Sequence, residues 1–114
     1  MTFEAFDVVV VPFPFTDRAA PRRRPALVLS GGRGFDARIG QSVLAMITTT
    51  ARSDWPLDAP IRNLQAAGLP APSLVRMKLF TLDHRLVLRK AGALDHDDRA
   101  AVTASVRALF AACL

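Results

Sequence analysis

The chain has 114 residues, enough for one compact domain and too few for two, so we expect residues 1–114 to form a single domain. Hydrophobic residues make up 51% and charged residues 22%, which is typical of a globular protein with a core. No apolar run is long enough to cross a membrane. The one cysteine, Cys113, excludes an intramolecular disulfide and a multi-cysteine metal site.

The charge balance is basic. Fifteen lysines and arginines stand against ten acidic residues, giving a net charge of +5 and a pI near 11.0. Such an excess favours association with a polyanion such as nucleic acid, although abundant arginine also follows from a GC-rich genome. The first residues lack the basic segment of a signal peptide, so we expect a cytoplasmic protein that contacts no membrane.

Three apolar runs in the first half predict β-strands. The first covers residues 7–12 and precedes a proline-containing loop from about residue 13 to residue 23. The second covers residues 25–30 and the third residues 42–50. The runs are continuous instead of alternating, as expected for strands in a small, tightly closed barrel.

The second half contains shorter elements. Residues 54–72 hold four prolines and predict a loop with one short strand. Residues 73–83 predict either a strand pair or one bent strand, and residues 87–93 predict a last short strand.

A different periodicity begins at Asp95. Apolar residues then recur at steps of four, three, one and three, which predicts an amphipathic helix with Asp95 as its N-cap. The apolar positions, predicted to pack in the core or in a dimer interface, are Val102, Val106, Leu109, Phe110 and Cys113. Many short strands followed by one helix predict a mainly β fold, a small barrel with a C-terminal α-helix.

Four segments carry a family resemblance through their order and spacing. They are DVVVVPFPFTD, RRRPALVLS, MITTTARSDWP and AGLPAPSLVRMKLFTLDHRLVLRKAGAL. Together they resemble the PemK/MazF (Kid) toxins of type II toxin–antitoxin systems, from about Phe6 to Leu114. The resemblance implies an SH3-like barrel, a homodimer, a cognate antitoxin, and metal-independent, cofactor-free endoribonuclease activity on single-stranded RNA.

The resemblance also implies site residues. Arg24, in the arginine–proline step, and Thr48, at the end of the third strand, correspond to the family's catalytic pair. Pro25 restricts Arg24 to an extended backbone, and the planar guanidinium can bind two phosphate oxygens together. The predicted RNA contacts are Arg22, Arg23, Thr49, Arg76 and Lys78.

Two positions depart from the family pattern. Phe6 stands where a glycine usually precedes the first aspartate. Lys78 stands where the Kid/PemK branch has an aspartate that serves as acid or base, and an ammonium group cannot accept a proton. The chemistry must therefore rest on Arg24 and Thr48 or use a carboxylate from elsewhere, for which Asp17 is our candidate base.

Several residues also have ordinary structural interpretations. Arginines 22–24 are a common kind of solvated loop charge, and threonines such as Thr48 are common in strands. We expect Trp55 to plug the core or a barrel end, and His84 and His96 to be solvated surface residues.

The residues leave other functions open. Lys78 is compatible with an inactive, toxin-like binding module or a CcdB-like gyrase inhibitor, although the C-terminus at Phe110 does not reproduce the CcdB ending. For the antitoxin, we expect an acidic or amphipathic segment that folds on binding around Arg24 and Arg76.

Overall fold

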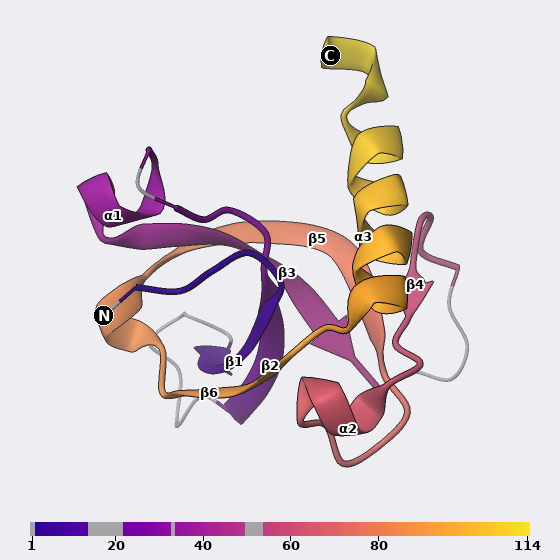
Figure 1. Ribbon diagram of the computed structural model, residues 1–114, viewed down its shortest axis with the longest axis horizontal. Coiled ribbons are helices and arrows are strands. Elements are labelled where there is room, and N and C mark those ends of the chain that lie inside the picture. Colours follow the sequence, from indigo (N-terminus) through magenta and orange to yellow (C-terminus); the bar gives the residue numbers. More distant parts are fainter. Residues whose placement is uncertain (1, 14–21, 33, 50–53) are drawn as a thin grey trace.

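The computed structural model of the chain describes residues 2–13, 22–32, 34–49 and 54–114 (Figure 1). Its elements are β1 (Asp7–Phe13), β2 (Arg22–Val28), α1 (Asp36–Ile39), β3 (Gln41–Thr48), β4 (Ala59–Pro60), α2 (Leu64–Ala67), β5 (Leu74–Asp83), η1 (His84–Leu86), β6 (Arg89–Ala93), α3 (His96–Leu109) and η2 (Ala111–Cys113). The strands form one curled antiparallel sheet in the order β4-β5-β3-β2-β1-β6, and α3 rises from it (Figure 1). This architecture confirms the mainly β prediction with a C-terminal helix.

The strand β2 begins earlier than the sequence predicts. We expected a loop through residue 23, but Arg22 already pairs with Phe13, and Arg24 pairs with Val11. The hydrogen-bonded ladder to β1 extends the strand into the arginine run, because tertiary pairing overrides the weak local preference of charged residues. Residues 14–21 of the predicted loop lie outside the described residues.

Of the two alternatives for residues 73–83, the single strand is the one that forms. β5 runs without interruption from Leu74 to Asp83 along β3, and the register shifts between Ala45 and Met46. A shift of this kind bends the ladder.

The two short helices α1 and α2 were not predicted from the sequence. α1 and α2 have four residues each, too few to produce a recognisable helical period. The side chain of Asn63 caps α2 by accepting a hydrogen bond from the Ala66 N–H at 3.0 Å, and Gly68 ends it with φ 72°. A Cβ on Gly68 would meet the Ala91 carbonyl oxygen at 2.1 Å, so this helix end packs directly on β6.

Both faces of the sheet are covered by apolar side chains. Because neighbouring residues of a strand point to opposite faces, β1, β2, β3 and β5 each contribute to two clusters. The first cluster packs against α2 and α3 and includes Val8, Leu27, Ala45, Ile47, Val75 and Val102. The second lies on the other face and includes Val9, Val11, Ala26, Val28 and Leu44. Burial on both faces explains why the apolar runs are continuous.

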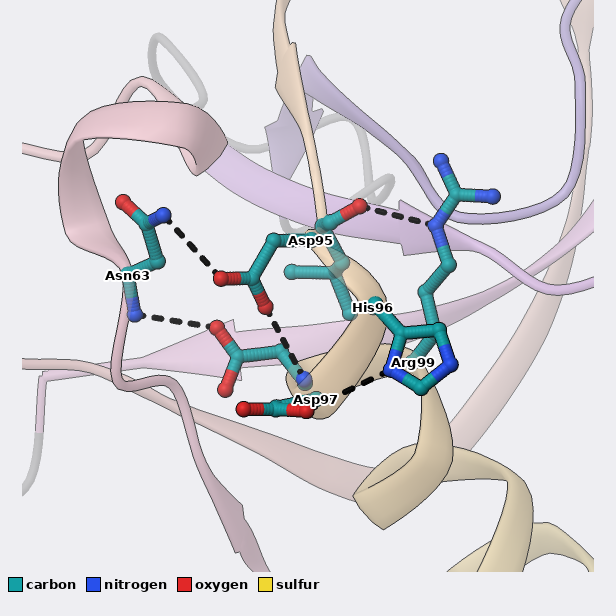
Figure 2. A network of polar contacts seen from close by, with 7 residues as sticks. Asn63, Asp95, His96, Asp97 and Arg99 are labelled. Atoms are coloured by element: carbon teal, nitrogen blue, oxygen red, sulfur yellow. Dashed lines mark hydrogen bonds and ion pairs between the residues drawn. The ribbon is translucent and has the colours of Figure 1, made fainter.

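The N-terminus of α3 is fixed to the start of α2 (Figure 2). The Asp95 carboxylate accepts hydrogen bonds from the Asp98 N–H and from the Asn63 side chain, both at 3.0 Å. The Asp98 carboxylate in turn accepts from the backbone N–H groups of Arg62 and Asn63. These bonds confirm Asp95 as the predicted N-cap.

Only the first part of the predicted apolar stripe of α3 enters the core. Val102 is buried and Val106 packs beside it, whereas Leu109, Phe110 and Cys113 are exposed. No helix among the described residues is long and apolar enough to cross a membrane.

Phe6 forms the turn before β1, at the position where the PemK/MazF toxins usually have a glycine. It adopts a left-handed φ of 73°, which is uncommon for an aromatic residue. The strained backbone is held on both sides, because the Phe6 N–H donates to the Val28 carbonyl at 2.7 Å and its own carbonyl accepts from Leu94 at 3.0 Å. Two strong backbone hydrogen bonds thus replace the conformational freedom of glycine.

Candidate functional site

The strand register brings Arg24 and Thr48 to the same place. Ala26 pairs with Met46, and Arg24 and Thr48 each lie two residues further towards the same end of the two strands. On the other side of β3, Met46 pairs with Arg76. Because side chains alternate, these residues all belong to one face of three adjacent strands.

The side chains meet at a hollow of about 130 Å³, which we call the strand-end hollow. Its lining residues are Phe13, Arg24, Met46, Ile47, Thr48, Arg76 and Lys78. Four of the residues singled out in the sequence, namely Arg24, Thr48, Arg76 and Lys78, are therefore brought together. The hollow combines three cationic groups with one hydroxyl, a set suited to binding phosphate oxygens.

Arg24 carries an unusual feature for a folded protein. Its Nε is buried and has no hydrogen-bond partner in the part of the chain that the structure describes. A buried N–H donor without an acceptor is costly, and such groups are found where function requires them.

Arg76 is held in one orientation by two neighbours. Its Nε and one terminal nitrogen donate to the two carboxylate oxygens of Asp58, at 3.3 and 3.1 Å. Its guanidinium carbon also lies 5.3 Å from the centre of the Trp55 ring. The side chains of Arg76 and Asp58 are only 20% and 10% exposed, so solvent screens this pair less than a surface salt bridge.

Lys78 lies two residues further along β5 and is exposed. Its ammonium group is 5.9 Å from the ring centres of both Phe13 and Trp55. The lysine thus sits between two aromatic rings at the edge of the hollow, where a cation attracts an anionic ligand.

The remaining predicted site residues lie around this centre or outside the described part of the chain. Arg22 and Arg23 are exposed on β2, and Thr49 is exposed just after β3. None of these three lines the strand-end hollow. Asp17, the candidate base, lies outside the described residues.

The carboxylate of Asp58 was not identified in the sequence. It precedes a strand of only two residues, and its place beside Arg76 depends on the pairing of β4 with β5. The one available signal was an acidic residue near the end of the third family segment, which is too weak to distinguish Asp58 from Asp54.

Two expectations about aromatic residues were wrong. Trp55 does not plug the core, because its side chain is 42% exposed and contacts the two cations of the site. His84 is not a solvated residue, whereas His96 is exposed as expected. His84 is 8% exposed, and its Nε2 lies 2.7 Å from the Ser42 hydroxyl. The same hydroxyl donates a hydrogen bond to buried Asp36 at 2.6 Å.

This buried trio does not form a nucleophilic site. Ser42 is 2% exposed and its hydroxyl proton is directed to Asp36, so the hydroxyl cannot reach a substrate. The network instead fastens α1 to β3 and to the start of η1. Among the described residues, no group of three or more histidine, cysteine, aspartate or glutamate side chains is gathered so as to hold a metal ion.

Comparison with solved structures identifies proteins of the same fold. The chain superposes on MazF in a MazE–MazF crystal structure from Deinococcus radiodurans with a TM-score of 0.77 at 21% identity, covering 97% of this chain and 98% of the other. The Mycobacterium tuberculosis toxin MazF-mt6 superposes with a TM-score of 0.69 at 22% identity, covering 92% of this chain and 96% of the toxin. An endoribonuclease in complex with its cognate antitoxin from a mycobacterial species superposes with a TM-score of 0.72 at 10% identity, covering 96% of this chain and 94% of the other.

Comparison with curated proteins finds no match. The profile of one protein family, described as PemK-like, MazF-like toxin of type II toxin-antitoxin system, matches residues 4–110. This match spans nearly the whole chain and includes the four segments noted in the sequence. The chain therefore belongs to the PemK-like, MazF-like toxins of type II toxin–antitoxin systems.

Proposed function

We propose that this toxin is a metal-independent endoribonuclease that cleaves single-stranded RNA by attack of a ribose 2′-hydroxyl. The observation that carries the proposal is the strand-end hollow, where Arg24, Thr48, Arg76 and Lys78 converge from three adjacent strands. Membership of the toxin family and the likeness to an endoribonuclease fold support it.

The reaction needs no group beyond the RNA and protein side chains. A base removes the proton of the 2′-hydroxyl, whose oxygen bonds to the adjacent phosphorus while the bond to the 5′-oxygen breaks. The leaving 5′-oxygen takes up a proton. The products are a 2′,3′-cyclic phosphate on one fragment and a 5′-hydroxyl on the other.

The residues of the hollow have separate roles in this scheme. Arg24 and Arg76 bind the non-bridging phosphate oxygens, on which negative charge grows in the transition state. Thr48 orients the same phosphate through its hydroxyl, and Lys78 attracts the RNA backbone. Asp17 remains our proposal for the base.

We further propose that the toxin acts in the cytoplasm as one domain per subunit of a homodimer, and that a cognate antitoxin neutralises it. Two solved structures of similar fold are complexes of a toxin or endoribonuclease with an antitoxin. The exposed apolar residues Leu109 and Phe110 at the end of α3 provide a surface for subunit contact.

Mapping of RNA fragment ends tests the reaction. Purified protein is incubated with a long single-stranded RNA in excess chelator, and both new ends of each cut are identified. We expect 2′,3′-cyclic phosphate and 5′-hydroxyl ends, formed at the same rate with and without chelator. Absence of cleavage, loss of cleavage in chelator, or 5′-phosphate ends would contradict the proposal. Inhibition of gyrase supercoiling without RNA cleavage would favour the CcdB-like alternative.

A further inference from the structure

The segment before β4 places the carboxylate of Asp58 beside Arg76. On β5 itself, the position two residues after Arg76 is the lysine Lys78 and carries no carboxylate. Ala59 pairs with Val75 in the antiparallel β4–β5 ladder, so one further step sets Asp58 opposite Arg76. The two side chains then share one face and form a cross-strand pair. The described hydrogen bonds agree, because both carboxylate oxygens accept from the Arg76 guanidinium.

The backbone beside Asp58 is strained, which is a second and independent observation. Leu57 has a left-handed φ of 68°, although it has a branched side chain and no glycine-like freedom. Its carbonyl accepts a hydrogen bond from the Ser105 hydroxyl of α3 at 2.9 Å. Strain of this kind persists where the surroundings fix it, and it often accompanies a functional site. Here the strained residue lies between Trp55 and Asp58, both of which contact Arg76.

We propose that Asp58 is a positioning residue that aims the Arg76 guanidinium at the scissile phosphate, an inference that rests on the proposed ribonuclease function. The carboxylate fixes one edge of the planar fork, and the Trp55 ring fixes one of its faces. Arginine has five N–H donors in a rigid plane, so fixing one edge directs the opposite edge. Asp58 thus places a carboxylate beside Arg76, in a positioning role that differs from the acid–base role of the aspartate that Lys78 replaces.

The same geometry argues against Asp58 as the general base. Both of its oxygens already accept hydrogen bonds from a cation, so a proton from the ribose 2′-hydroxyl would find a weak acceptor. Its effect on the reaction passes through Arg76. This distinction makes the two roles separable by experiment.

The first experiment compares Asp58→Asn with Asp54→Asn, which removes an equal charge from an exposed residue four positions earlier. We expect Asp58→Asn to lower kcat by about tenfold to a hundredfold, because a misplaced catalytic group loses rate steeply. KM stays equal or falls, since removing an acid from a basic site does not weaken RNA binding. The pH profile keeps its shape, and Asp54→Asn behaves as the unmodified toxin. A kcat within twofold of the unmodified toxin, or loss of one limb of the pH profile, would overturn the proposal.

The second experiment repeats the substitution in an Arg76→Ala background. A residue that acts only through Arg76 has no further effect there, so kcat for the double variant should equal that for Arg76→Ala. An additional loss of tenfold or more would mean that Asp58 acts directly on the RNA and would overturn the positioning role.

A third measurement does not depend on cleavage. In a nitrogen–proton NMR spectrum, the Nε–H proton of Arg76 should exchange slowly with water in the unmodified toxin. In the folded Asp58→Asn variant it should exchange fast. Unchanged exchange would refute the positioning of Arg76 even if RNA is cleaved. If the signal responds as expected but the unmodified toxin cuts no RNA, the proposed function fails and the arrangement of Arg76 stands.

Discussion

At the scale of single residues, the candidate site contains several groups whose conformation or burial lowers the stability of the fold. Arg24 keeps a buried Nε without an acceptor among the described residues, Leu57 holds a left-handed backbone, and Trp55 is exposed beside two cations. Each feature lowers stability locally and is retained by surrounding contacts. Replacing such residues should therefore affect activity more than stability.

Arg24 gives a direct test of that relation. A buried N–H without a partner costs about 1–3 kcal/mol, so Arg24→Ala removes a penalty together with some packing. We expect its free energy of unfolding to lie within about 1 kcal/mol of the unmodified toxin. The matched control is Arg99→Ala, because the Arg99 Nε donates to the Leu94 carbonyl at 2.8 Å. Chemical denaturation should show Arg99→Ala as the less stable variant, and the reverse order would contradict this account.

At the scale of elements, the register of the sheet assembles the site and the helix caps hold its support in place. The α3 helix carries Ser105, which bonds to the strained Leu57, so the position of α3 matters for Asp58. That position is fixed by the Asp95 and Asp98 carboxylates at the helix start (Figure 2).

The Asp95 cap predicts a pH dependence of stability. The hydrogen bond from the Asp98 N–H, and then that from the Asn63 side chain, hold the pKa of Asp95 below its ordinary value of 3.8. Because the folded protein binds this proton less tightly than the unfolded chain, Asp95 stabilises the fold above pH 3.8 and loses this effect as pH falls through its folded pKa. Thermal melts should show Asp95→Asn less stable than the unmodified toxin at neutral pH, with a difference that shrinks in acid. Asp97→Asn, at an exposed first-turn residue, is the control. A difference that grows in acid would contradict the assignment.

The elements also show how far sequence reasoning reaches. The strands and the α3 helix follow from local patterns, and the grouping of Arg24 with Thr48 at one hollow follows from the order of the family segments. Asp58 could not be predicted, since its role depends on the pairing of a two-residue strand with β5 and on Arg76, which lies 18 positions later in the chain. The burial of His84 likewise depends on Ser42, which is 42 residues away in the sequence. Contacts between distant segments leave no periodic signal in a single chain.

At the scale of the whole molecule, the net charge of +5 favours association with a polyanion. In the proposed function, the strand-end hollow adds contacts to one phosphate of the RNA. Binding to single-stranded RNA should weaken with salt by a slope of about −0.7 per phosphate contact in a plot of log affinity against log salt. We expect Lys78→Ala to reduce this slope by about 0.7, because the lysine contacts a single phosphate. Arg38→Ala, on the exposed end of α1, removes an equal charge and should leave the slope unchanged. Fluorescence anisotropy with a non-cleavable oligonucleotide measures both, and equal slopes for the two variants would contradict a specific contact.

The central claim is that Arg24 and Thr48 bind the same scissile phosphate. Single-turnover cleavage rates of the unmodified toxin, Arg24→Ala, Thr48→Ala and the double variant test it most directly. We expect each single substitution to slow cleavage by about a hundredfold or more, and the double variant to be no more than a few times slower than the slower single variant. Losses that multiply in the double variant, or either single variant cleaving at the unmodified rate, would contradict it.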